Sequence, residues 1–195
     1  MGALETIYFS VTTSEASEDL HYWATRDSFN KTTRQRIMDA DIILIPWDRK
    51  RDEIGDSFPS GTEAFFKAIQ ESLGHGKIAI AANEGEFSEL ALHSNEVRLP
   101  TLLATIVILP IALNLLSAQI DRYVTSPKPP ATIEMSLVID GQDGHCVKID
   151  YKGPPKDVIA TFEDQINRCF PHVKEDENID SIIPTPNLKP ENTDD

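Results

Sequence analysis

DIILIP, at residues 41–46, is the stretch that decides the fold. Four consecutive aliphatic residues between an aspartate and a proline are typical of a strand buried on both faces, as in a parallel sheet. KIAIAA at residues 77–82 has the same character. Between these two runs, apolar side chains recur at four-residue steps from Phe65 to Leu73, which predicts a helix. Strand, helix and strand in this order predict a βαβ unit with parallel pairing.

The N-terminal region predicts a further strand of the same sheet. IYFSV at residues 7–11 is a short β-prone run, and TTSE at residues 12–15 has the capping residues of a helix start. We expect a polar helical stretch from there to about Met38. Three strands pointing one way place their carboxyl ends at a shared crevice, as in Rossmann-like folds.

The segment 99–120 has no charged residue, and three structures fit it. By length it qualifies as a transmembrane helix. Alternatively, residues 102–109 form a central strand and Pro110 occupies the first position of a buried helix. The third possibility is a proline-kinked core helix across the whole span. We disfavour the membrane alternative, because a single span splits an otherwise coherent sheet protein.

The C-terminal part changes in pattern after a proline-rich linker. Apolar and polar residues alternate from Ile133 to Ile139 and from Val147 to Tyr151, which predicts an antiparallel hairpin with one apolar face. A helix follows, because apolar side chains from Val158 onward share one of its sides.

The predicted fold class is therefore α/β, a flavodoxin/Rossmann-like parallel sheet with a C-terminal antiparallel hairpin plus helix. Residues 1–126 are expected to form the Rossmann-like domain and residues 131–172 the hairpin–helix extension. Residues 173–195 are acidic and proline-spotted, and we expect this tail to be disordered.

Composition limits the partners and the cofactors. Eighteen basic against 32 acidic residues give a net charge of −14, which argues against a nucleic-acid-binding surface. There are 2 cysteines, and no signal peptide is apparent, so we expect a cytoplasmic protein. His145 and Cys146 are neighbours on a predicted strand and face opposite ways, which leaves too few ligands for zinc. We expect no metal and no cofactor.

The segment GDSFPSGTE, at residues 55–63, lies between a predicted strand and a predicted helix. Free backbone amides at a helix start attract anions, and a glycine at position 61 lets a ligand approach the backbone. It is not a Walker loop, because no Gly-Lys-Ser/Thr follows. The simpler interpretation, which we favour, is that Ser60 or Thr62 caps the helix while Gly61 serves the turn.

The order of ADIILI at 40–45, a charged loop, SGTEAF at 60–65 and GKIAI at 76–80 resembles nucleoside 2-deoxyribosyltransferases. It is similar, more distantly, to Toll/interleukin-receptor-type NAD hydrolases, which share the flavodoxin-like layout. The resemblance covers about residues 5–85. In the deoxyribosyltransferase family a Ser-Gly-Thr turn holds the sugar, and a glutamate three residues after the threonine is the nucleophile. Phe65 stands at that position here, so the resemblance supports the fold more than the activity.

If the predicted crevice is used, its residues follow the predicted strands and open the following helix. Candidate ligand-binding residues are Ser14, Trp47, Asp48, Ser60, Gly61, Thr62 and Asn83. The candidate catalytic carboxylates, whose expected role is to attack or stabilise a ribosyl carbon, are Glu63, Asp56 and Glu15.

The missing nucleophile favours binding over catalysis. The sequence predicts an accessory or sensor module that binds a nucleotide-like ligand or a protein partner, within a homo-oligomer or a hetero-complex. The alternatives are a nucleoside or NAD glycosidase of deoxyribosyltransferase-like type and a membrane effector that spans at 99–120.

Overall fold

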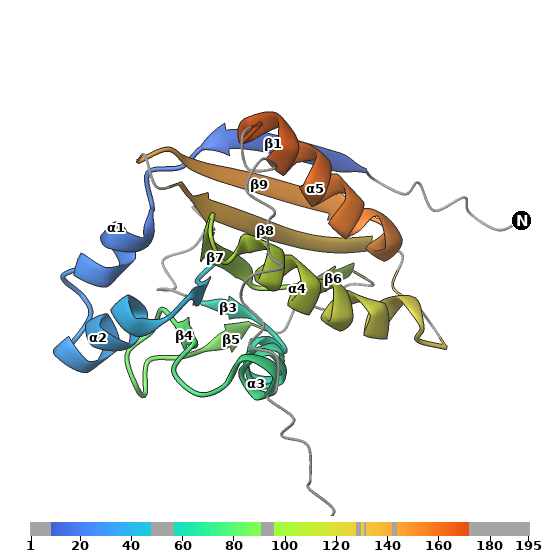
Figure 1. The fold of residues 1–195 in the computed structure, drawn as a ribbon. Coiled ribbons are helices and arrows are strands. Elements are labelled where there is room, and N and C mark those ends of the chain that lie inside the picture. Colours follow the sequence, from blue (N-terminus) through green and yellow to red (C-terminus); the bar gives the residue numbers. More distant parts are fainter. Residues whose placement is uncertain are drawn as a thin grey trace, which may run out of the picture.

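The computed structural model describes residues 9–47, 57–90, 96–127, 130, 132–141 and 144–171, which form a mixed α/β fold around a central sheet (Figure 1). The sheet is seven-stranded, in the order β1-β9-β8-β7-β2-β4, with β6 paired to β8 beside β7. The bounds are β1 (Ser10–Glu15), β2 (Ile42–Ile45), β4 (Ile78–Ile80), β6 (Glu96–Arg98), β7 (Thr101–Thr105), β8 (Thr132–Asp140) and β9 (Cys146–Gly153). A separate parallel pair joins β3 (Phe58–Pro59) to β5 (Glu89–Leu90).

The strand directions are mixed. β2 pairs with β4 in parallel, as predicted, and β7 pairs with β8 in parallel. However, β2 pairs antiparallel with β7, β8 with β9, and β9 with β1. The prediction of one parallel sheet is therefore wrong, although the prediction of an α/β fold is confirmed.

The first strand lies at the far edge of the sheet from β4. Its ladder with β9 runs from the Ser10–Lys152 pair to the Glu15–Val147 pair. Residues 12–15, which we expected to start a helix, belong to this strand because they complete the antiparallel ladder. The capping residues at 12–15 are a local pattern. Such a pattern cannot reveal that β9, more than 130 residues further along the chain, offers a sheet edge with which these residues pair. The carboxyl end of β1 consequently lies at the opposite end of the sheet from those of β2 and β4.

Helices cover both faces of the sheet. They are α1 (Leu20–Thr25), α2 (Lys31–Asp39), α3 (Thr62–Leu73), α4 (Leu109–Val124) and α5 (Val158–Cys169), with a 3-10 turn, η1 (Pro155–Asp157), before α5. The helical stretch expected up to Met38 is divided into α1 and α2. Each has its own side-chain cap, because Asp19 accepts from the Tyr22 amide and Asn30 accepts from the Thr33 amide.

The uncharged segment 99–120 forms β7 and most of α4, with Pro110 in the first turn of the helix. This confirms the strand-plus-helix alternative. The helix is amphipathic, because Ala112, Leu116 and Ile120 are buried while Ile111 is exposed. Among the described residues, no helix has both the length and the apolar character needed to cross a membrane.

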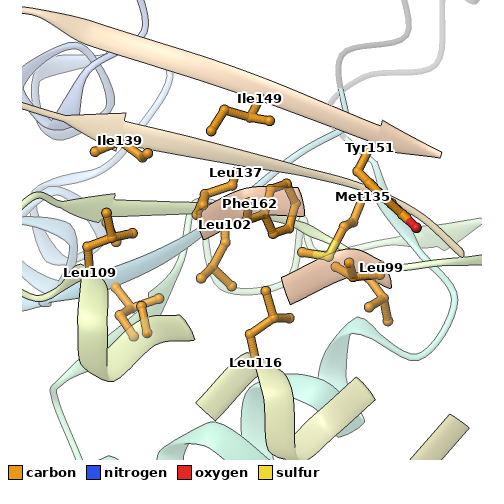
Figure 2. Packing of buried hydrophobic residues seen from close by; sticks show 14 of the residues in the cluster. Leu99, Leu102, Leu109, Leu116, Met135, Leu137, Ile139, Ile149, Tyr151 and Phe162 are labelled. Carbon is orange, nitrogen blue, oxygen red and sulfur yellow. The ribbon is translucent and has the colours of Figure 1, made fainter. Parts of the chain in front are cut away.

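The larger hydrophobic core lies between the sheet and the helices α3, α4 and α5. Figure 2 shows Phe162 of α5 and Leu116 of α4 on the same side of the sheet as Leu102, Leu137 and Ile149. A second cluster covers the other face, where the side chains of α1 and α2 pack on β2, β7 and β8.

The hairpin pairs β8 with β9 from Ile133–Gly153 to Asp140–Cys146. β8 also pairs with β7, so both strands of the hairpin share one sheet with β2 and β4. The predicted tail, 173–195, lies outside the described residues.

We predict that Phe162→Ala lowers the free energy of unfolding by about 3–5 kcal/mol, because it leaves a cavity in the larger core. Phe162 is 0% exposed and packs against Tyr151. Urea unfolding followed by circular dichroism measures the change. The control is Val107→Ala, at a side chain 67% exposed, where we expect a change within about 0.5 kcal/mol. Equal losses in the two variants contradict this account of the core.

Candidate functional site

The structure separates the residues of the predicted crevice. Ser14 and Glu15 lie on β1, opposite Lys148 and Val147 of β9, at the far side of the sheet from β2 and β4. They do not join the residues that follow β2 and β4, because β1 runs in the opposite direction. Asp48 and Asp56 lie outside the described residues.

The Ser60-Gly61-Thr62 turn is filled by a side chain of the protein itself. Both carboxylate oxygens of Glu89, on β5, accept from backbone amides, one from Gly61 at 2.9 Å and one from Glu63 at 2.7 Å. Gly61 is the N-cap residue of α3 and adopts the left-handed conformation, with φ 91°. The helix start therefore binds an anion, as the amides suggested, but this anion is an internal carboxylate.

Neither Ser60 nor Thr62 caps the helix through its side chain. Thr62 instead donates from its hydroxyl to the Pro59 carbonyl at 2.7 Å and is fully buried. Our capping interpretation was correct about Gly61 and wrong about the hydroxyls. Glu89 lies 26 residues after Glu63, so no local pattern identifies it as the cap.

Glu63 pairs with a lysine, and Phe65 belongs to the core. The Glu63 carboxylate is exposed and accepts from Lys67 Nζ at 2.6 Å, one turn further along α3. This carboxylate raises the pKa of Lys67. Phe65 is 6% exposed and belongs to the larger core. The position at which the resembling family carries its nucleophile thus points into packed hydrophobic side chains.

Asn83 ties the exit of β4 to the connection between α1 and α2. Its Oδ1 accepts from the Asn30 amide at 2.9 Å, and its Nδ2 donates to the Ser28 carbonyl at 2.9 Å and to Glu86 at 2.8 Å. Its side chain is buried and engaged at both ends. We therefore assign Asn83 a structural role.

Trp47 follows β2 and contacts an arginine. The Arg98 guanidinium carbon lies 4.4 Å from the centre of the Trp47 ring, which is a cation–π contact. Arg98 Nε also donates to Glu134 at 3.0 Å. The guanidinium therefore covers a ring that we expected to stack on a base.

A groove lies beside the outer edge of β4. It encloses a cavity of about 420 Å³, within the range of roughly 300–1,000 Å³ that is usual for ligand sites. One wall is α2 and the other is α3, and β4 with the preceding turn forms the floor. The lining residues are Arg36, Asp39, Phe66, Gln70, Gly76, Ile78, Ala79 and Ile80. No local sequence pattern reveals this site, because its two walls and its floor come from three separate elements.

The floor of the groove is a sheet edge. Among the described residues, β4 forms a ladder only with β2. Lys77 and Ala81 bond to β2, since the Lys77 carbonyl accepts from Ile42 and the Ala81 amide donates to Leu44. Because successive residues of a strand direct their backbone groups to opposite sides, Ile78 and Ile80 direct theirs into the groove.

The structure does not present Cys146 as an activated thiol. No group of three or more His, Cys, Asp or Glu side chains that could hold a metal ion occurs in the described part of the chain. Burial, with Asp140 and Asp19 adding smaller effects, raises the pKa of Cys146 to about 12. A thiol that stays protonated is a poor nucleophile.

No protein-family model, curated protein or solved structure matches this chain. The case for a function therefore comes from the geometry of its own residues.

We predict that Glu89→Ala lowers the free energy of unfolding by about 1 kcal/mol, because the amides of Gly61 and Glu63 lose their acceptor. Thermal unfolding measures the loss. The matched control is Glu84→Ala, which removes an exposed carboxylate from the loop after β4. If the two variants are equally stable, the carboxylate of Glu89 does not cap α3.

We predict that Cys146 resists thiol reagents in the native protein. At pH 8 a thiol with a pKa near 12 is almost entirely protonated, and its side chain is buried. Labelling with dithionitrobenzoate in a Cys169→Ser variant measures Cys146 alone, and a Cys146→Ser variant reports the half-buried Cys169. We expect fast labelling of Cys146 only after unfolding in urea. Equal native rates for both thiols contradict the prediction.

Proposed function

We propose that this chain is a non-catalytic interaction module, an accessory or sensor subunit that binds an extended segment of a partner protein. The segment joins the central sheet as a further strand beside β4. The observation that carries the proposal is the groove in which the edge of β4 lies between α2 and α3. Strand addition to an open sheet edge is a recurring mode of peptide recognition.

The shape of the groove favours one strand over a folded domain. Side chains from α2 and from α3 line its two walls, so the helices flank the edge on both faces of the sheet. A single extended segment fits between them and bonds to the outward backbone groups of Ile78 and Ile80. These backbone hydrogen bonds supply affinity, and the side chains of the walls supply selectivity.

Three contacts make a nucleotide-like ligand the weaker choice. Glu89 occupies the amides that could hold a phosphate, Arg98 covers the Trp47 ring, and Asn83 is bonded within the chain. The groove beside β4 offers instead a sheet edge, an aromatic side chain on the α3 wall and two charged side chains on the α2 wall.

The glycosidase alternative stays a prediction with its own test. Purified protein is incubated with nucleosides and with NAD, and free base is measured by chromatography. Base release that is lost in Glu63→Gln favours the enzyme over the interaction module.

We predict that Ile80→Pro weakens the binding of extended peptides while leaving the sheet intact. Proline removes the outward amide of residue 80, and it is tolerated on an edge strand where that amide does not serve the ladder. Peptides are selected from a random library on the immobilised full chain, and their affinities are measured by fluorescence anisotropy. We expect a loss of at least about tenfold in Ile80→Pro, since a backbone hydrogen bond and its steric fit are both lost.

Ile80→Val, which keeps the amide and a β-branched side chain, is the matched control and should bind nearly as well as the unaltered chain. Circular dichroism establishes that both variants fold. Selected peptides that bind Ile80→Pro as tightly as the unaltered chain, or a selection that yields none, overturn the proposed function.

A further inference from the structure

We infer that the segment bound in this groove runs parallel to β4, with a basic residue at its N-terminal end and an acidic residue at its C-terminal end. The inference rests on the proposed function and names the chemistry of its partner. Between the two charges lie apolar side chains that face α3. Three observations give the direction, the apolar positions and the charges.

The direction follows from the backbone groups that the edge offers. The Ile80 carbonyl already accepts from the Ala82 amide at 2.9 Å. An antiparallel strand exchanges both hydrogen bonds with each residue of the edge and therefore needs this carbonyl. A parallel strand needs only the Ile78 amide, the Ile78 carbonyl and the Ile80 amide for two successive pairings. Because the Ile80 carbonyl is already bonded to Ala82, the other backbone groups of this edge fit a parallel strand and not an antiparallel one.

The apolar positions follow from the alternation of side chains. Ile78 and Ile80 face the α3 side, since both pack with the larger core to which Phe66 also contributes. Residues of the added strand that lie opposite Ile78 and Ile80 point the same way, toward Phe66 and Gln70. Aliphatic side chains suit these two positions because Phe66 gives the α3 wall an apolar surface.

The charges follow from the two ends of the α2 wall. Arg36 lies at the carboxyl end of β4, because its Nη2 donates to the Ala82 carbonyl at 3.1 Å. Asp39, the last residue of α2, lies near the start of β4. Two residues later, the Asp41 amide donates to the Lys77 carbonyl, just before β4, at 2.9 Å. A parallel strand therefore meets Asp39 first and Arg36 last, on the side occupied by Ala79.

The pattern is basic, aliphatic, small, aliphatic and acidic. The small residue lies opposite Ala79, and the flanking charges point toward α2. A second copy of this chain fits less well, because a symmetric pair of β4 strands is antiparallel and each carries its own flanking helices.

The test uses the full chain labelled with nitrogen-15 and two synthetic peptides, acetyl-Lys-Ile-Ala-Ile-Glu-amide and acetyl-Glu-Ile-Ala-Ile-Lys-amide. Titrations follow the amide signals of Ile78 and Ile80. We expect the first peptide to shift both signals and to bind about fivefold tighter than the second, because each charge then meets its opposite. Asp39→Lys should remove this preference. Glu163→Lys on the exposed face of α5 makes the same change in net charge and should preserve it.

Equal or tighter binding of the second peptide overturns the direction and charge pattern, while shifts at Ile78 and Ile80 still support strand addition. If neither peptide shifts these amides but library peptides lose affinity in Ile80→Pro, the proposed function stands and this chemistry is wrong. A dimer detected by light scattering and lost in Ile80→Pro makes a second copy the occupant and also overturns the inference.

Discussion

The fold depends on the burial of β8 from both sides. Its residues from Ile133 to Ile139 alternate between the core under α4 and α5 and the opposite face of the sheet, where Val138 packs with the second cluster. β8 also pairs along both edges, with β9 on one and with β6 and β7 on the other. A strand covered in this way must occupy the centre of the sheet, and β1 and β4 are left as its two ends.

The two ends of the sheet differ in chemistry. β1 exposes most of its serine, threonine and glutamate side chains, which are poor partners for a further apolar strand. β4 is a short aliphatic strand with helices on both faces. An aliphatic sheet edge that is exposed to solvent promotes aggregation by pairing with other chains. The two helices beside β4 limit access to this edge to a single extended segment. This difference is the reason why we propose the recognition surface at β4 and not at β1.

Local patterns predicted the elements better than their arrangement. The runs at 41–46 and 77–82, the helix between them, the hairpin and α5 all have periodicities that neighbouring residues determine. The position of β1 depends on an edge supplied by residues 146–153, and the antiparallel direction of β7 depends on packing across the sheet. The predicted crevice required β1 to run parallel to β2 and β4, and β1 runs in the opposite direction, so the crevice does not form. No local sequence rule predicts that Glu89 caps α3, because it lies 26 residues after Glu63.

An acidic chain gains from recognition that uses the backbone. With a net charge of −14, long-range attraction favours basic partners in general and discriminates poorly among them. The hydrogen bonds that we propose to the outward groups of Ile78 and Ile80 are independent of the partner's charge and would supply affinity to any extended segment that fits. In the proposed complex Arg36 and Asp39, opposite in sign on one helix, reject segments whose charges are reversed, since like charges in contact are unfavourable. Because Glu89 already occupies the amides at the start of α3, the proposed selectivity rests on the two walls of the groove.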